Sequence, residues 1–271
     1  MTISSDLFLS ILSMDAYNRD YDAGIDISGS RLGGAQILSR DSLGISESDY
    51  HAWQTVGFYA LAYELQADEQ IEGLSQSDIL ISYRGTDNVD FTTLGEGASD
   101  FWQGWITGAR VPGSQSWLAL DFFESVTGSD ALSGESSGAI LTGHSLGGGL
   151  AGMVAALSGD QAVIIDNMPY GAAASLLSMW WNATQLGTDV ATLVASGEPE
   201  NYLWPAASNI TAYNVGDEAL ANIRAIESAA ATLLLGPLGA FAGANAILMS
   251  FSEKTQDPLE HHLGLLGLAQ R

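Results

Sequence analysis

The chain alternates short apolar runs with longer segments of helical pattern. Four apolar runs have the length of strands buried on both faces: residues 78–83, 139–142, 161–165 and 209–215. Three longer segments have helical spacing or small apolar residues: residues 116–127, 146–158 and 171–195. Strands that alternate with helices predict an α/β fold with a mostly parallel central sheet and helices on both faces.

The first third of the chain gives weaker signals. Residues 6–17 have apolar positions on one side and predict a short helix. Residues 22–50 are rich in Gly, Ser and Asp, which predicts loops with one strand at 35–39. Residues 53–65 are rich in aromatic side chains and predict paired strands. Ser116 is the expected N-cap of the helix that follows it.

These elements predict a single domain. The 271 residues suit one large α/β domain, and 46% of them are apolar, so a sizeable core can form. No internal repeat or long linker divides the chain. We therefore expect one domain over residues 1–271, with residues 1–50 as an N-terminal extension packed on it.

Residues 228–252 contain no charged side chain and are long enough to span a bilayer. The segment nevertheless contains Gly236, Pro237 and Asn245, and no basic residues flank it to set an orientation. We expect a pair of buried helices or an apolar lid or cap over a site, and the protein is not expected to be transmembrane.

The charge balance excludes some partners. The formal net charge is -24, from 32 acidic and 8 basic residues. Such a surface repels nucleic acid and anionic lipid, so we expect no nucleic acid as a partner. Residues 20–26 (DYDAGID) resemble a calcium loop, but the loop lacks the required Glu at its twelfth position. We expect no metal and no cofactor in the site. Binding of calcium at the surface is left open by the sequence.

Cysteine is absent, which excludes disulfides and thiol catalysis. The N-terminus lacks a basic region and carries Asp6 within its apolar part, which argues against an ordinary signal peptide. Secretion by a signal-independent route and a cytoplasmic location both stay open, as does the oligomeric state.

The pattern G-x-S-x-G occurs twice, around Ser136 and around Ser145. Chance alone predicts roughly 0.4 matches in a chain with this much Gly and Ser, so context has to separate the two. Ser145 has a predicted strand before it and a small-residue helix after it, as a nucleophile elbow requires. Ser136 lies between a helix end and a strand, which predicts a loop. The sequence therefore indicates Ser145 as the nucleophile.

An elbow also predicts an oxyanion hole. One donor is the backbone N–H of Leu146, at the N-terminus of a helix whose dipole favours an anion. The second donor should follow an earlier strand, and Thr86 follows the strand at residues 78–83 through Arg84 and Gly85. We expect Thr86 to offer its backbone N–H and its hydroxyl.

The chain has only four candidates for the general base: His51, His144, His261 and His262. His144 lies within the elbow, where its side chain does not easily turn back to Ser145, and we interpret it as structural. The order nucleophile, acid, histidine leaves His261 or His262, and spacing does not choose between them.

The acid should follow a strand that lies between Ser145 and the late histidines in the sequence. Asp217 lies just past the strand at residues 209–215 and is the best candidate. Asp166, which follows the strand at residues 161–165, is its rival. Asp160 and Asp189 are expected at the surface.

The motifs SYRGT (residues 82–86), GHSLGG (143–148) and NVGD (214–217) resemble those of the class 3 lipase family of α/β-hydrolases. The resemblance covers about residues 50–268. It implies an α/β-hydrolase fold with an apolar lid or cap, and no cofactor. It also implies Ser145 as nucleophile, Thr86 in the oxyanion hole and Asp217 as acid. The family histidine falls in EHHLGLL, where Leu263 two positions later favours His261 over His262.

The expected activity is hydrolysis of carboxylic esters by acyl transfer to serine, with acylglycerols as substrates and transient contact with a lipid interface. A phospholipase A1 and a short-chain or aromatic esterase are alternatives. A protein of another class, an inactive lipid- or calcium-associated binding module, is also open. The acyl-binding wall is expected at Trp102, Trp105 and Ile106, or in residues 228–252.

Overall fold

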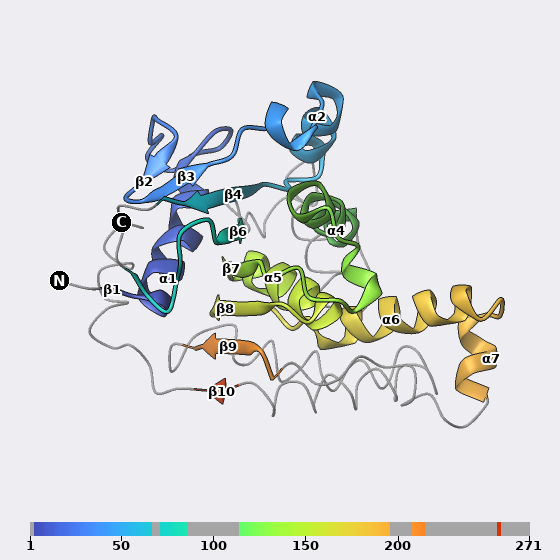
Figure 1. Ribbon diagram of the computed structural model, residues 1–271. Coiled ribbons are helices and arrows are strands. Elements are labelled where there is room, and N and C mark those ends of the chain that lie inside the picture. The colour runs from blue at the N-terminus through green and yellow to red at the C-terminus, as the bar shows by residue number, and fades with distance from the viewer. Residues whose placement is uncertain (1–2, 67–70, 86–113, 196–207, 215–253, 256–271) are drawn as a thin grey trace, which may run out of the picture.

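A computed structural model describes residues 3–66, 71–85, 114–195, 208–214 and 254–255. These residues form an α/β fold around an eight-stranded sheet (Figure 1). The strands of that sheet are β2 (Arg31–Leu32), β3 (Ala35–Ile37), β4 (Ala60–Leu65), β6 (Ile79–Tyr83), β7 (Ile140–His144), β8 (Gln161–Ile165), β9 (Ile210–Tyr213) and β10 (Lys254–Thr255). A second sheet pairs β1 (Ile3–Ser4) with β5 (Ile71–Glu72) in parallel.

The order of strands in the large sheet is β10-β9-β8-β7-β6-β4-β3-β2. Every pair from β10 to β6 is parallel, while β6, β4, β3 and β2 pair antiparallel. The larger part of the sheet is therefore parallel, as the alternating pattern predicts, and an antiparallel part is added at the β2 edge.

The helices are α1 (Ser5–Asp15), α2 (Glu47–Thr55), α4 (Ser114–Thr127), α5 (Leu146–Ser158), α6 (Gly171–Gln185) and α7 (Val190–Ala195), with short 3-10 helices η1 (Ala16–Asn18), η2 (Asp41–Leu43) and η3 (Ala131–Ser133). Both α1 and α5 pack against β7 and β8, and α4 and α6 pack against α5. In Figure 1 the sheet runs between α1 and the group formed by α4, α5 and α6.

The register shows that α1 and α5 cover opposite faces. Ser82 of β6 and Thr142 of β7 are partners in the sheet and point to the same face. Their hydroxyls donate to the carbonyl oxygens of Leu12 (3.0 Å) and Leu9 (3.1 Å) in α1. The next residue of β7, Gly143, therefore points to the other face, where it contacts the first turn of α5. The helices on both faces confirm that part of the fold prediction.

Several predicted elements are confirmed with small shifts. The helix predicted over residues 6–17 is α1, and the helix predicted over 146–158 has those bounds in α5. The strands predicted at 78–83, 161–165 and 209–215 are β6, β8 and β9. The strand predicted at 139–142 is β7, which continues to His144. The segment 171–195 forms two helices, separated by a turn in which Gly187 has a φ of 65°.

The prediction of paired strands over residues 53–65 is wrong in its first part. Residues up to Thr55 belong to α2, and only Ala60–Leu65 is a strand. The helix begins in a polar segment because Ser46 and Asp49 form a capping box, in which each side chain bonds the other's backbone N–H. Tyr50 and Trp53 are buried three residues apart on one helix face, so these aromatic residues belong to helical rather than strand spacing.

Two further local predictions are corrected. Residues 22–50, expected to be loops with one strand, also contain β2, η2 and the beginning of α2. Ser116 is not an N-cap, because α4 begins at Ser114 and Ser116 is fully buried within the helix. Only the local pattern of a helix start was available from the sequence, and it placed the start two residues late.

The first fifty residues form part of the sheet and of one of its covering layers. They supply β2, β3 and α1, so the segment expected to be an extension belongs to the central architecture. A buried ion pair stabilises this segment: the Arg19 guanidinium lies 2.6 Å from the carboxylate of Asp15. The same guanidinium donates to the carbonyl of Gly29, and Tyr63 of β4 donates to Asp15. These bonds connect the end of α1 with the sheet.

No helix within the described residues is long and apolar enough to cross a bilayer. Residues 228–252, expected to form a lid or buried helices, lie outside the described residues.

Candidate functional site

Ser145 joins β7 to α5 in a backbone conformation that is unusual for a residue with a side chain. Its φ is 56° and its ψ is -123°, values of a turn position that glycine usually occupies. A conformation of this kind costs about 1–3 kcal/mol and persists only where the surrounding structure enforces it. Here the Ser145 N–H donates to Ile165 (3.0 Å), and its carbonyl accepts from Met168 (2.9 Å) and Gly149 (3.1 Å).

The two glycines of the motif are required by close contact between backbones. A Cβ on Gly143 would overlap the carbonyl group of Gly147, one turn into α5. A Cβ on Gly147 would overlap the carbonyl oxygen of Tyr83 at the end of β6. Any larger residue at either position would push α5 away from the sheet. The spacing G-x-S-x-G around Ser145 thus follows from the contact among β6, β7 and α5.

The first turn of α5 supplies backbone N–H donors beside Ser145. Leu146 is the first residue of this 13-residue helix, and its side chain is buried. The N–H groups of a first turn have no partner within the helix, and the helix dipole gives them a partial positive charge. Ser145 is half-buried at that terminus. The Leu146 N–H therefore belongs to the first turn that directly follows Ser145, as the prediction of an oxyanion donor requires.

The end of β6 approaches the elbow through Gly85. A Cβ on Gly85 would lie 2.6 Å from the carbonyl oxygen of His144 and would overlap the hydroxyl of Tyr17. Only glycine fits at this point without moving one of its neighbours. The chain that leads to Thr86 therefore passes directly beside the residue that precedes Ser145.

Arg84 fixes the course of the same segment. Its buried guanidinium lies over the rings of Tyr21 (4.4 Å) and Tyr59 (4.6 Å) and donates to the carbonyl of Tyr21 (2.8 Å). The Arg84 N–H donates to the carbonyl of Tyr59 (3.0 Å). A cation between two aromatic faces is stabilised by both. The Arg-Gly pair of the SYRGT motif is thus a fixed backbone element rather than a solvent-exposed turn.

His144 is held by Tyr17, a residue that sequence reasoning missed. The hydroxyl of Tyr17, in η1, lies 3.0 Å from Nδ1 of His144 and 3.2 Å from its carbonyl oxygen. The two rings meet edge to face at 5.8 Å. Tyr17 and His144 are 127 residues apart, and no sequence pattern links them. These contacts agree with the structural role expected for His144.

Burial lowers the pKa of His144 below its ordinary value of 6.5, because the imidazolium loses hydration there. The Asp166 carboxylate acts in the opposite direction and raises it, but burial is the larger cause. Asp166 follows β8, is buried, and has a φ of 43°. Its N–H donates to the carbonyl of Tyr213 (2.8 Å). The rival acid therefore lies at the same sheet edge as the elbow.

The other predicted site residues lie outside the described residues. They are Thr86, Trp102, Trp105, Ile106, Asp217, His261 and His262. Within the described part of the chain, the structure brings Ser145 and Leu146 together at the β7–α5 junction. There is also no group of three or more His, Asp or Glu side chains that could hold a metal in that part.

The second G-x-S-x-G serine has a different environment. Ser136 lies in a loop, as expected, and its hydroxyl donates to Asp160 (2.6 Å). Ser137 and the Gly138 N–H donate to the same carboxylate. Asp160 is 1% exposed, so its expected surface position is wrong. The carboxylate accepts three bonds that pair this loop with the beginning of β8, and these bonds offset its loss of hydration.

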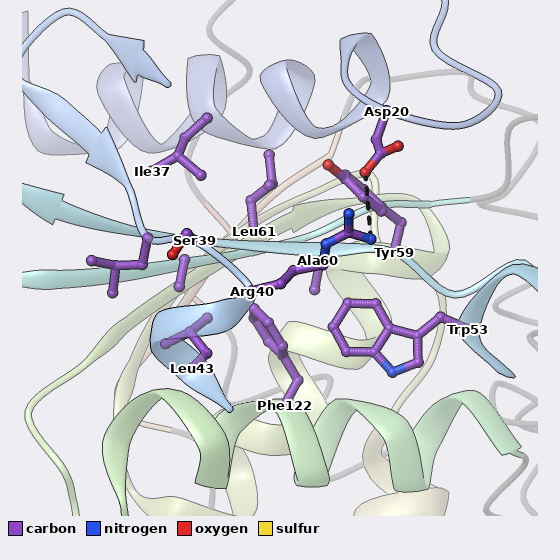
Figure 2. Close-up of a pocket in the computed structure, with 12 residues that line it drawn as sticks. Asp20, Ile37, Ser39, Arg40, Leu43, Trp53, Tyr59, Ala60, Leu61 and Phe122 are labelled. Carbon is purple, nitrogen blue, oxygen red and sulfur yellow. Dashed lines mark ion pairs between the residues drawn. The ribbon is translucent and has the colours of Figure 1, made fainter. Parts of the chain in front are cut away.

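The described residues also line a cavity of about 260 Å³, shown in Figure 2. Its walls are mostly apolar and include Leu61, Trp53 and Phe122. Arg40 and Asp20 form an ion pair of 4.0 Å at this cavity. Neither Ser145 nor Leu146 lines it. The cavity is therefore separate from the elbow and is not its substrate site.

Comparisons with known proteins assign no family to this chain. No protein-family model matches it, and no curated protein matches it significantly. The functional interpretation therefore depends on the geometry around Ser145 and on the sequence motifs.

The position of His144 predicts a pH dependence of stability. Because the folded state lowers the pKa of His144, its contribution is complete above pH 6.5 and is lost as the pH falls below that value. We expect the free energy of unfolding of the wild type to fall between pH 7.5 and 5.5 by more than that of His144→Gln. The difference is at most about 1.4 kcal/mol for each pH unit. Urea denaturation at both pH values measures it, and parallel slopes for the two proteins would contradict the assignment.

Proposed function

We propose that this protein is a serine carboxylic-ester hydrolase of the α/β-hydrolase fold, with Ser145 as its nucleophile. The observation that carries the proposal is the conformation of Ser145 between β7 and α5, enforced by backbone contacts at Gly143 and Gly147. A strained strand-to-helix turn lifts the hydroxyl to the edge of the sheet, which is what a nucleophile elbow requires. Ser136, the serine of the other G-x-S-x-G pattern, does not have a positive φ.

The arrangement of the strands supports the same proposal. The strand before Ser145 has β6 on one side and β8 on the other, and all three are parallel. Ligands in open parallel sheets bind at the carboxyl ends of the strands. Gly85 follows β6 and Ser145 follows β7, so the Thr86 loop and the elbow start from neighbouring strand ends. The resemblance of SYRGT and GHSLGG to class 3 lipases agrees with this placement.

The proposed reaction is acyl transfer. The Ser145 oxygen attacks the ester carbonyl while His261 takes its proton, and Asp217 holds the imidazole and stabilises its charged form. Leu146 N–H and Thr86 stabilise the developing oxyanion, each donor contributing about 3 kcal/mol. The histidinium then protonates the leaving alcohol. Water repeats these steps on the acyl-enzyme, which releases the acid and restores the serine.

The two serine motifs give a matched pair of variants. Ser145→Ala should abolish hydrolysis of p-nitrophenyl butyrate and labelling by a fluorophosphonate, because no acyl-enzyme can form. Ser136→Ala should keep the wild-type turnover, because its hydroxyl bonds Asp160 and the Gly138 N–H within its own loop and not the elbow. Steady-state kinetics and mass spectrometry of the labelled protein measure both effects. If the wild type is neither active nor labelled, the binding-module alternative replaces this proposal.

The identities of the acid and the base are tested by two pairs of substitutions. His261→Ala should lower kcat by about 10³-fold or more, whereas His262→Ala should change it little. Asp217→Asn should lower kcat strongly, whereas Asp166→Asn should act mainly on His144, whose pKa its carboxylate raises. Turnover of p-nitrophenyl butyrate by the four variants gives the assignment. A reversed order within either pair would transfer the role to the other residue.

We further propose acylglycerols as the substrate class. Trp117 of α4 and Trp180 of α6 are 38% and 47% exposed, and their rings meet edge to face at 5.5 Å. Exposed tryptophans suit a boundary between water and lipid, because their rings are apolar and their N–H groups are polar. The apolar residues 228–252 and the aromatic residues at 101–105 provide further lipid-binding chemistry in the sequence.

This proposal predicts a preference for aggregated substrates. The wild type should hydrolyse emulsified long-chain triacylglycerol faster than it hydrolyses soluble short-chain esters, because an interface adds binding energy through apolar contact. Titration of released acid at constant pH measures both rates. Equal or faster turnover of the soluble esters would instead favour the esterase alternative, and release of acid from phosphatidylcholine would favour phospholipase A1.

A further inference from the structure

We propose that Tyr17 is a positioning residue of the Ser145 site, acting through His144 and Gly85. The inference rests on the proposed function and deepens it, because it makes the first segment of the chain part of the active-site framework. Tyr17 does not touch the bond that is hydrolysed. Its phenol instead fixes the residue before the nucleophile relative to the residue before Thr86.

The backbone around Tyr17 is anchored on both sides. Before it, α1 accepts hydrogen bonds from Ser82 and Thr142 of the central strands. After it, Arg19 is 4% exposed and bonds Asp15 at 2.6 Å. Tyr17 therefore lies between two fixed points, and its ring is directed at the elbow rather than at solvent. An aromatic side chain held in this way loses little further freedom when it makes a hydrogen bond.

The hydroxyl of Tyr17 meets both polar groups of His144. Its oxygen lies 3.0 Å from Nδ1 and 3.2 Å from the carbonyl oxygen. A phenol has one proton to donate, so the two contacts are satisfied together when the hydroxyl donates to the carbonyl and Nδ1–H donates to the phenol oxygen. The geometry thus assigns the Nδ1–H tautomer to neutral His144. In this arrangement the last residue of β7 is held through its backbone and its side chain at once.

The same hydroxyl occupies the space beside Gly85. A Cβ at Gly85 would overlap it, and the carbonyl oxygen of His144 lies 2.6 Å from that Cβ position. Tyr17 therefore fills the junction between the end of β6 and the end of β7. The two proposed oxyanion donors, Thr86 and Leu146, come directly after these two strand ends. The junction that Tyr17 fills therefore sets the separation of Gly85 and His144, the described residues that precede Thr86 and Ser145.

A small displacement at this junction should act on rate more than on substrate binding. Oxyanion donors stabilise charge that develops only in the transition state, so their misplacement lowers kcat and leaves KM nearly unchanged. A residue that only stabilises the fold would change the melting temperature instead. Measuring both kcat and the melting temperature therefore distinguishes a positioning role from a purely structural one.

Tyr17→Phe removes the hydroxyl and keeps the ring. We expect kcat on p-nitrophenyl butyrate to fall about 3- to 10-fold, the range for loss of a hydrogen bond, with KM within about twofold of wild type. Fluorophosphonate labelling of Ser145 should slow by the same factor. In ¹⁵N-correlated NMR spectra, the neutral His144 ring should lose the Nδ1–H pattern, since its partner is gone.

Tyr63→Phe is the matched control. Tyr63 is buried, and its hydroxyl donates to Asp15 at 2.9 Å, so the variant removes a phenol bond from the same N-terminal unit without touching His144. The Asp15–Arg19 pair on either side of Tyr17 remains in this variant. Tyr63→Phe should therefore lower the melting temperature and leave kcat, the labelling rate and the His144 tautomer as in wild type. An equal fall of kcat in Tyr17→Phe and Tyr63→Phe would show that Tyr17 only stabilises the fold, which would overturn the proposal.

The outcomes separate this inference from the proposed function. If wild-type Ser145 is labelled and active, and Tyr17→Phe is labelled at the wild-type rate, the role of Tyr17 is wrong and the hydrolase proposal stands. If wild-type Ser145 neither reacts nor turns over ester, both proposals fall. An Nε2–H tautomer of His144 in the wild type would overturn the assigned hydrogen bonds whatever the kinetics show.

Discussion

The site depends on one steric constraint, the close approach of the backbones of β6, β7 and α5. Gly147 lies against the carbonyl of Tyr83, and Gly143 lies against Gly147. With the helix this near the sheet, the chain has a single residue in which to turn from strand to helix. Ser145 makes that turn at positive φ, at a cost of about 1–3 kcal/mol. Its backbone bonds to Ile165 and Met168 hold it there, because both belong to the adjoining β8 strand and loop.

The opposite face of the sheet supports the same constraint. Hydroxyls of Ser82 in β6 and Thr142 in β7 bond carbonyls of α1, so α1 connects the two strands on this face of the sheet. The buried ion pair of Asp15 and Arg19 lies where the chain leaves α1 for β2 and β3. A buried ion pair adds little net stability relative to apolar packing, but loss of one partner leaves an unpaired charge. Arg19 follows η1 directly, so its pair with Asp15 joins the two residues on either side of this 3-10 helix.

The sequence predicts those parts of the site whose structure depends on residues close in the chain. Three local features predict β7, the turn at Ser145 and α5, because each depends on residues close in sequence. They are the apolar run 139–142, the glycines around Ser145 and the small residues of 146–158. The aromatic content of residues 53–65 predicts a strand from residue 53, but the capping box at Ser46 begins a helix that continues to Thr55. Contacts between residues that are far apart in the chain have no recognisable sequence pattern. Tyr17 beside His144, and Asp160 beneath the Ser136 loop, arise only when the chain is folded.

The strand positions also bear on the proposed choice of Asp217 over Asp166 as the acid. An acid and a nucleophile must leave room for an imidazole and two hydrogen bonds, each of about 2.8 Å, between them. Neighbouring strands are only about 4.8 Å apart. Asp166 follows β8, the strand next to β7, so it begins too near Ser145 to leave that space, and its carboxylate acts on His144 instead. Asp217, the acid in the proposed triad, comes four residues after β9 in the sequence and lies outside the described residues. The strand β9 itself is two strands from β7, a spacing of about 10 Å, which is wide enough for an imidazole between an acid that follows β9 and Ser145.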